Sequence, residues 1–205
     1  MLTTNHISVM NFENAMRGAR NPLNSWNRSD SYYDEKGAYV LGPNDLDLAK
    51  RLRNAGSDHR KYLRQVLVSM DITAPLYWWK EFDTYKVGTV ANSCSTMHKI
   101  HANAFTAEDF SCEGMTEKTR ERFDGVIAYL EELRVAYNET KDKALWLDMI
   151  QFLPSSYNQM RTVTMNYENL INMYHARHTH KLVEWHQFCD AIAALPYAKE
   201  LIIGE

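Results

Sequence analysis

The chain has 205 residues, of which 45% are hydrophobic and 24% are charged, so it can bury a core and is too apolar for a disordered protein. Its formal net charge of −3 argues against general nucleic-acid binding, which needs a concentrated positive field. No signal peptide and no apolar run of ~18–20 residues are found, so we expect a soluble protein. The length favours a single domain over residues 1–205, with two small domains as the alternative.

The cysteines indicate a reducing compartment. Cys94, Cys112 and Cys189 are odd in number and lack the spacing of a metal site. We therefore expect free thiols and a cytoplasmic protein. Cys94 lies among polar residues, where a reactive thiol is conceivable, but a small buried filler is the favoured interpretation.

The N-terminal part predicts short elements. Residues 7–10 favour a strand that passes into a helical turn, and the turn formers of residues 19–31 predict an ordered loop. Residues 42–56 predict a helix that Asn44 or Asp45 caps and that ends just before Gly56. Its apolar positions are Leu46, Leu48, Ala49 and Leu52.

A strand with one buried face is predicted next. Apolar residues alternate with other residues over 66–73, and Pro75 ends the run. The expected buried positions are Val66, Val68, Met70 and Ile72. Pro75 also suits the first position of a helix over residues 75–86.

The second half of the chain is predicted to be helical. Thr116 can cap an amphipathic helix whose apolar positions follow at intervals of three to four residues. They are Phe123, Val126, Ile127, Leu130 and Leu133. A further helix in residues 143–154 is closed by Pro154, and residues 160–195 predict one or two long helices. The fold class is therefore α+β, helix-dominant, with a small antiparallel sheet.

Histidines are frequent near the C-terminus. His180 and Glu184, four residues apart, would share a face of a helix and could grip a divalent metal. A third ligand is lacking, so exposed or hydrogen-bonded histidines are the favoured interpretation and no metal is expected. The pair His98 and His101 is interpreted in the same way.

Three polar residues stand out in the same region. Asn166, Asn172 and Arg177 lie six and then five residues apart among packing residues. An asparagine inside a helix needs a partner for its amide, and a heterocycle or a neighbouring backbone would serve. Arg177 suits a carboxylate, a phosphate or a base edge. Hydrogen bonds between helices, or an ion pair with Glu168 or Glu184, are the structural alternative.

Residues 85–101, YKVGTVANSCSTMHKIH, form a polar segment behind an aromatic one. Gly88 permits close backbone approach, and the hydroxyls of Ser93, Ser95 and Thr96 could cradle an anion. The segment is neither a GxxxxGK[ST] loop nor a GxGxxG turn. A capped turn between a strand and a helix explains it equally well.

The order of these parts resembles the flavin-dependent thymidylate synthases over most of the chain. The shared order begins with an early strand, an Ala-Arg loop (GARNPLNSWNRSDS), a helix and a Gly/His turn (GSDHRKYL). A strand ending in Ala-Pro (VSMDITAPLYWW) then leads into the polar segment. Late in the chain, FLPSSYNQMRTVTMNYENLINMYHAR resembles the Leu-Pro turn of the family and the long helix that follows it.

The family's central motif is only partly kept. It reads Arg-His-Arg, two residues, Ser, one residue, Asn-Glu, one residue, Ser, one residue, Arg. This sequence keeps Asn92 and Ser95, whereas Arg-His-Arg becomes residues 85–87, or residues 84–86 with a shift of one. The other departures are Val90, Ser93 and Met97, and before the Leu-Pro turn Ile150 stands where the family has an arginine. Asn166, Asn172 and Arg177 match the family's flavin-contacting asparagines and base-contacting arginine.

This resemblance implies a one-carbon transfer to C5 of dUMP or a related pyrimidine. FAD, NADPH and methylenetetrahydrofolate would be the cofactor and co-substrates, and the protein would be a homotetramer. Ser95 and Arg177 would position the pyrimidine as catalytic and substrate-binding residues, and Lys86 could replace part of the lost phosphate-binding charge. The cofactor-binding residues would be Asn92, Asn166 and Asn172. The alternative is a non-catalytic, homo-oligomeric nucleotide-binding or structural protein that kept the fold and lost flavin chemistry.

Overall fold

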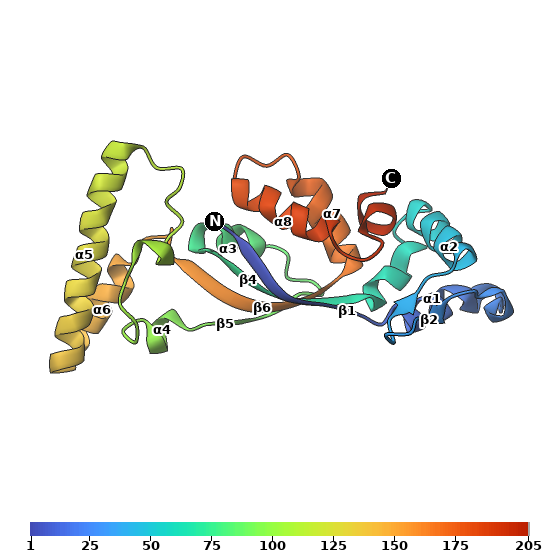
Figure 1. Cartoon of the computed structure of the whole chain (residues 1–205), viewed down its shortest axis with the longest axis horizontal. Helices are drawn as coiled ribbons and strands as arrows, with labels where there is room; N and C mark the ends of the chain where they lie inside the picture. Colours follow the sequence, from blue (N-terminus) through green and yellow to red (C-terminus); the bar gives the residue numbers. More distant parts are fainter. Residues whose placement is uncertain (205) are drawn as a thin grey trace. The chain divides into compact units, whose positions relative to one another are not determined.

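The computed structural model describes residues 1–204 and confirms the predicted fold class (Figure 1). Helices predominate, and a small antiparallel sheet has the strand order β1-β4-β6-β5. Its strands are β1 (Thr3–Met10), β4 (Leu67–Pro75), β5 (Val90–Ser93) and β6 (Asn158–Asn166). The helices are α1 (Phe12–Arg20), α2 (Pro43–Asn54), α3 (Leu76–Phe82), α4 (Thr96–Lys99), α5 (Glu117–Thr140), α6 (Lys143–Phe152), α7 (Tyr167–Arg177) and α8 (Val183–Ala193).

The chain forms two compact units. The first consists of residues 1–3, 72–84 and 92–162, and the second of residues 4–71, residues 85–91 and the chain from residue 163 onward. Each of the four sheet strands contributes residues to both units. The single domain expected over residues 1–205 therefore stays a prediction.

The second unit is built on the strand that its alternation predicted. Val66, Val68 and Met70 are fully or almost fully buried, whereas Leu67 between them is exposed. A 3-10 helix (Arg60–Gln65) precedes this strand and packs against α1, α2 and α7. A hairpin of β2 (Tyr32–Tyr33) and β3 (Tyr39–Val40) completes the unit, with Tyr33 opposite Tyr39.

The cap predicted for α2 is wrong. Its N-cap is Gly42, and Asp45 lies inside the helix, completely buried. The exposed amides are capped from another segment, because the Asp30 carboxylate accepts hydrogen bonds from the backbone N–H groups of Asn44 (2.8 Å) and Asp45 (3.0 Å). Of the predicted apolar positions, Ala49 is buried and the three leucines are half-buried.

Asp45 instead forms a buried ion pair with the last residue of α1. The Arg20 guanidinium lies 2.5 Å from Asp45 Oδ1, and the two side chains are 5% and 0% exposed. The hydroxyls of Ser29 (2.6 Å) and Ser31 (2.5 Å) donate to the other carboxylate oxygen. Every oxygen of the buried carboxylate therefore has a partner, and α1 is fixed to α2.

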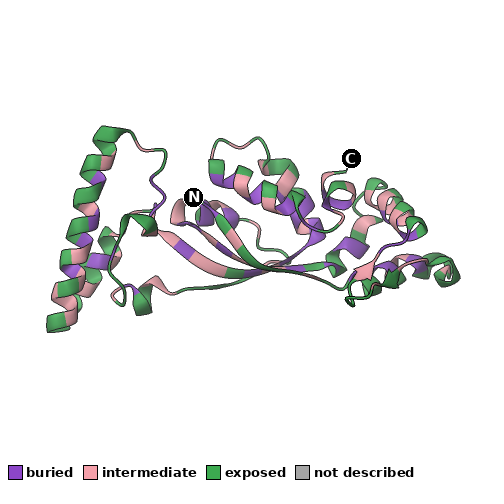
Figure 2. Ribbon diagram, viewed as in Figure 1, coloured by how far each residue is buried: buried purple, intermediate pink, exposed green. Residues whose placement is uncertain are grey.

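In the first unit, α5 and α6 pack on each other. Phe123, Ile127, Leu130 and Leu133 are buried at the predicted spacing, and α5 begins directly after Thr116. Figure 2 shows buried segments recurring along α5. Pro75 is the N-cap of α3 rather than its first residue, and α3 buries Trp78, Trp79 and Phe82.

The prediction of helix from residue 160 is wrong for the first part of that segment. Residues 158–166 form β6, in which Val163 and Met165 are buried while Thr162 is exposed and Thr164 half-buried. This is the period of a strand, and β-branched residues favour it. The two predicted helices follow as α7 and α8. No helix in the described part of the chain is long and apolar enough to cross a membrane.

Candidate functional site

The N-terminus of α7 is organised by two asparagines. Asn166 is the N-cap of α7, where its Oδ1 accepts a hydrogen bond from the backbone N–H of Asn169 at 3.0 Å. Asn169 Oδ1 accepts one from the backbone N–H of Asn166 at 3.1 Å. The sequence predicted that Asn166 lies inside a helix, and this is wrong, because Asn166 precedes the first residue of α7. Its side-chain oxygen is used in this reciprocal cap, so any further contact of this side chain as a donor has to come from its NH₂ group.

Residues 85–91 are held against this end of α7. Asn169 Nδ2 donates to the backbone oxygen of Val87 at 2.7 Å. Gly88 has φ +74°, and a Cβ at this position would lie 3.0 Å from Asn166 Nδ2 and 3.0 Å from Asn169 Oδ1. Glycine is thus required twice, by the backbone conformation and by the close approach. Thr89 Oγ1, one residue later, is buried without a hydrogen-bond partner.

Arg177 lies at the other end of α7 and meets the start of the same segment. Its Nε donates to Tyr85 Oη at 2.9 Å. Its guanidinium carbon lies 5.6 Å from the centre of the Tyr85 ring and 4.8 Å from the centre of the Trp185 ring. Two aromatic rings therefore fix the orientation of a half-buried cation. Residues 85–88 therefore run alongside α7, from its last residue, Arg177, back to its first turn at Asn169.

The first turn of α7 also carries a charged cluster. Glu168, which is 8% exposed, accepts hydrogen bonds from Arg60 Nε (3.2 Å) and from Arg64 Nε. Burial by itself would raise the pKa of Glu168, but the bonds from Arg64 and Arg60 outweigh it and lower the pKa. The carboxylate is therefore ionised at neutral pH. Glu168 is committed to these two arginines, which come from the 3-10 helix before β4.

Arg64 connects this cluster to a cavity of about 710 Å³, which we call the basic cavity. Its wall is formed by the end of α1, by α2 and by the turn before β4. The lining residues are Gly18, Ala19, Asn21, Pro22, Leu52, Asp58, His59, Lys61, Tyr62, Arg64 and Gln65. Three basic side chains and one carboxylate thus surround a space of the size that ligand sites have.

The sequence did not single out this cavity, although its signal was present. The Ala-Arg loop and the Gly/His turn, which are far apart in sequence, provide most of its wall. In and directly after this turn, His59, Arg60, Lys61 and Arg64 lie within six residues. A basic run after Gly56 indicates an anion site only when a second segment closes the space around it, and that closure is a tertiary feature.

The six predicted site residues fall into two groups. Four of them belong to the second unit. Asn166 is the N-cap of α7, Asn172 and Arg177 lie on α7, and Lys86 lies in the segment of residues 85–91 that runs alongside α7. Asn172 and Lys86 are exposed.

The other two site residues belong to the first unit. Asn92 is an exposed residue of β5. Ser95 is the N-cap of α4, where its Oγ accepts from the backbone N–H of His98 at 3.1 Å. This is the capped turn that was the structural alternative for the polar segment. The assignment of Asn92 and Ser95 to a ligand site stays a prediction.

The two positions where the family has arginines carry apolar side chains here, and only Ile150 has a packing role. Ile150 packs against the core between α5 and α6. Met97 is 47% exposed, and its backbone oxygen accepts a hydrogen bond from Trp146 Nε1 at 3.0 Å. Neither position provides charge for a phosphate.

The structure confirms part of the expectations for cysteine and histidine and corrects the rest. Cys94 is exposed rather than buried, whereas Cys112 and Cys189 are buried, and all three thiols are free. His180 lies between α7 and α8, with its Nδ1 accepting from the backbone N–H of Leu182 at 3.2 Å, so it shares no helix face with Glu184. Within residues 1–204, no three His, Cys, Asp or Glu side chains gather as a metal site would require.

Comparison with known proteins identifies the fold of this chain through solved structures. No protein-family model and no curated protein matches the sequence. Among solved structures, flavin-dependent thymidylate synthase ThyX from Helicobacter pylori, complexed with FAD and dUMP, matches with a TM-score of 0.68 and 19% identity over 98% of this chain and 97% of that one. A second structure of ThyX from Helicobacter pylori with FAD and dUMP matches with a TM-score of 0.69 and 20% identity, over 98% and 96% of the two chains. The chain therefore has the fold of the flavin-dependent thymidylate synthases.

Proposed function

We propose that this chain is a divergent flavin-dependent thymidylate synthase-like protein, which transfers a one-carbon unit to C5 of dUMP or a related pyrimidine. The observation that carries the proposal is the basic cavity. Most of its wall is built by two of the segments that resemble the family, the Ala-Arg loop and the Gly/His turn, and Arg64 connects it to the first turn of α7 through Glu168. The shared fold over 98% of the chain supports the same assignment.

The residues of the second unit fit a flavin nucleotide. A cavity of about 710 Å³ can hold a large part of such a ligand, and His59, Lys61 and Arg64 offer charge for its phosphates. The buried, unpartnered Thr89 Oγ1 is a group that a ligand can satisfy. We assign FAD to this region, with the amides of Asn166 and Asn172 as its contacts, whereas Asn92, which belongs to the first unit, stays a contact implied by the family resemblance alone.

The protein's contribution to the reaction is binding and orientation. When bound, FAD reduced by NADPH would supply the reducing equivalents for a one-carbon transfer from methylenetetrahydrofolate. Arg177, whose plane is fixed by Tyr85 and Trp185, would hold a pyrimidine through its polar edge. The hydroxyl of Ser95 would donate a hydrogen bond to the pyrimidine while it accepts one from the backbone N–H of His98. No protein nucleophile is required.

The phosphate side of the substrate is where this protein would differ from the family. Apolar side chains at Met97 and Ile150 remove two charged contacts, each worth about 1.5–3 kcal/mol. Lys86 is exposed and supplies a point charge instead of a bidentate fork. We therefore favour a substrate whose phosphate group is bound less tightly than the phosphate of dUMP is bound in the family. A different pyrimidine derivative is the other option.

The same two losses favour the second candidate, a non-catalytic protein that keeps the fold. In both cases we propose a homo-oligomer, with the homotetramer of the family as the expected form. Size-exclusion chromatography with light scattering measures the number of subunits directly, and a monomer would contradict this part of the proposal.

The absorbance spectrum of the purified protein separates the two candidates. Flavin bands, or thermal stabilisation by added FAD, are expected for the enzyme. Colourless protein that FAD neither stabilises nor quenches would contradict it and leave the non-catalytic candidate. If flavin binds, titration with dUMP followed by flavin absorbance tests the substrate.

Arg177 tests the assignment of the pyrimidine site. We expect Arg177→Ala to reduce methyl transfer at least 100-fold while FAD stays bound. Arg51→Ala, at an arginine on α2 whose side chain is 68% exposed, is the control and should leave turnover unchanged. Equal turnover of the Arg177 variant and the control would refute the assignment.

A further inference from the structure

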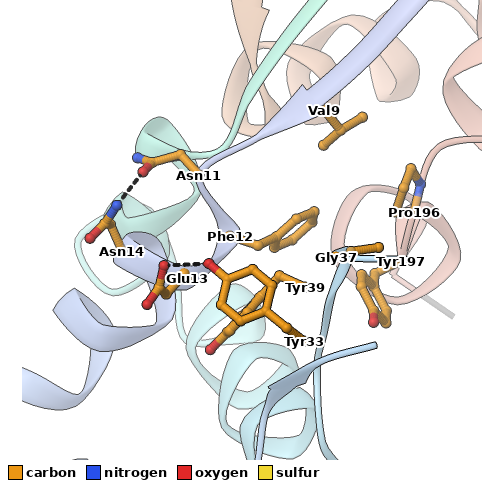
Figure 3. Close-up of a pocket in the computed structure, with 11 residues that line it drawn as sticks. Val9, Asn11, Phe12, Glu13, Asn14, Tyr33, Gly37, Tyr39, Pro196 and Tyr197 are labelled. Carbon is orange, nitrogen blue, oxygen red and sulfur yellow. Dashed lines mark hydrogen bonds between the residues drawn. The ribbon is translucent and has the colours of Figure 1, made fainter. Parts of the chain in front are cut away.

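A second cavity of the same unit has different chemistry. It measures about 450 Å³ and lies between the start of α1, the β2–β3 hairpin and residues 196 and 197 (Figure 3). We call it the aromatic cavity. Its lining residues are Val9, Asn11, Phe12, Glu13, Asn14, Tyr33, Gly37, Ala38, Tyr39, Pro196 and Tyr197. None of them was a predicted site residue.

Four aromatic rings surround this space in two pairs. Tyr33 and Tyr39 of the hairpin have ring centres 5.2 Å apart and planes at 65°. Phe12 and Tyr197 have ring centres 5.4 Å apart and planes at 77°. Tyr33 is 57% exposed, so its ring is accessible from solvent.

The cavity has a negative charge without a positive one. Glu13 is the only charged side chain among the described residues of its lining, which includes no lysine, arginine or histidine. Tyr33 Oη donates to Glu13 Oε2 at 2.6 Å, as the dashed line in Figure 3 marks. This bond raises the pKa of the Tyr33 phenol, which stays protonated at neutral pH. A carboxylate beside several rings attracts a cation and repels a phosphate.

The backbone holds two of the lining residues in an uncommon conformation. Asn11 and Tyr197 have φ values of +74° and +54°, in the left-handed region that non-glycine residues seldom adopt. Both are fixed by hydrogen bonds: Asn11 Nδ2 donates to the backbone oxygen of Gln65 at 2.9 Å, and Tyr197 Oη accepts from the backbone N–H of Leu41 at 2.8 Å. Such strain is concentrated at ligand sites.

We propose that the aromatic cavity binds a small organic cation with an N-alkylated ammonium group. The four rings can surround such a group with contact surface, the negative face of an aromatic ring attracts a cation, and Glu13 balances its charge. An alkylated ammonium fits better than a primary one. A primary ammonium brings three N–H donors that need acceptors, whereas methyl groups are satisfied by contact with rings.

Calorimetric titration of the full-length protein tests this inference with three probes. Choline carries the alkylated cation, 3,3-dimethylbutan-1-ol is its uncharged analogue of the same shape, and ethanolamine is the primary amine. We expect choline to bind at least tenfold more tightly than either of the others. Equal binding of choline and the alcohol would overturn the role of charge. Tighter binding of ethanolamine would overturn the alkylated class, and no binding of choline at millimolar concentration would overturn the site.

Variants locate the binding. Tyr39→Ala and Glu13→Gln should each weaken choline binding at least fivefold, and Glu13→Gln should also abolish the preference over the alcohol. Tyr32→Ala is the matched control, because Tyr32 is a neighbouring exposed tyrosine of β2 that does not line the cavity. Circular dichroism verifies that each variant is folded. Unchanged binding in both Tyr39→Ala and Glu13→Gln would refute the proposed location.

Discussion

The two cavities of the second unit lie at opposite ends of α1 and differ in charge. Glu13 lines the aromatic cavity at the first turn, and Gly18 and Ala19 line the basic cavity at the last. The dipole of α1 is positive at its first turn and negative at its last, so the helix itself would attract neither a cation to the aromatic cavity nor a phosphate to the basic cavity. The difference in charge comes from side chains, with Glu13 in the aromatic cavity and His59, Lys61 and Arg64 in the basic cavity. The predictions below test whether the two sites are independent.

The largest effect is expected where the support of both cavities is removed. Asp45→Ala leaves the buried Arg20 without its partner, and such a loss costs about 3–5 kcal/mol. Because α1 carries residues of both cavities, binding of FAD and of choline should be lost together. Chemical denaturation measures the loss of stability. Asp47→Ala, which removes an exposed carboxylate from the same helix, should change stability by less than about 0.5 kcal/mol.

The same carboxylate makes stability depend on pH. Burial alone would raise the pKa of Asp45, but hydrogen bonds from Ser29, Ser31 and Arg20 outweigh it, and the net pKa is lowered. The stabilisation is therefore complete above the unfolded-state pKa of about 4 and is lost as the pH falls through the folded-state value. We expect the difference in unfolding free energy between wild type and Asp45→Ala to shrink on acidification below pH 4. A difference that is constant from pH 7 to pH 2.5 would contradict this assignment.

Glu168→Gln should damage the basic cavity and spare the aromatic one. Replacing the carboxylate weakens its charged bonds to Arg60 and Arg64, at a cost of about 2 kcal/mol. Thermal unfolding should show a decrease in melting temperature of about 4–8 °C. Choline binding should remain within twofold of wild type. A loss of choline binding equal to the loss of FAD binding would show that the two cavities are coupled.

Gly88→Ala should cost about 1–2 kcal/mol, because the new Cβ would crowd Asn166 and Asn169 at φ +74°. Gly125→Ala provides a control of opposite sign. Gly125 lies inside α5 with open space around its Cβ position, so alanine there should stabilise by about 0.5–1 kcal/mol. Denaturation of both variants under one condition measures the contrast. A neutral Gly88→Ala would contradict the close packing of residues 85–91 on α7.

The smallest effect is expected for Lys61→Met, which removes one charge from the basic cavity. FAD binding should weaken about fivefold, equivalent to roughly 1 kcal/mol, and lose part of its dependence on salt. Choline binding should not change. Fluorescence titration of FAD at two salt concentrations provides the measurement, and an unchanged affinity at both would exclude Lys61 from the phosphate contacts.

The sequence predicted the elements whose periodicity was strong. Alternation identified β4, and apolar spacing identified α5 with its start at Thr116. It failed at β6, where residues 160–166 were assigned to helix because the polar residues that follow belong to one. The alternation of Val163 and Met165 with threonines was the signal for a strand.

The site was only partly accessible to sequence reasoning. The sequence predicted that three site residues gather on one C-terminal helix, but it did not predict that the side chain of Asn166 caps that helix. Asp45 was taken for a cap because its role as the partner of Arg20 depends on how α1 meets α2. Both cavities escaped prediction, since their walls come from segments that are distant in sequence and their chemistry arises from that assembly.

The bond from Arg177 to Tyr85 links ligand binding to the position of a chain segment. Tyr85 holds Arg177 at one end of residues 85–88, and Asn169 holds Val87 near the other. The bond to Tyr85 uses only the Nε–H of Arg177, so a ligand that binds the terminal nitrogens would meet a guanidinium whose plane this segment already sets. By reciprocity, a ligand that prefers the oriented guanidinium would stabilise the anchored segment by the same factor. In this protein the arginine that would recognise a substrate also anchors the chain segment that begins at Tyr85.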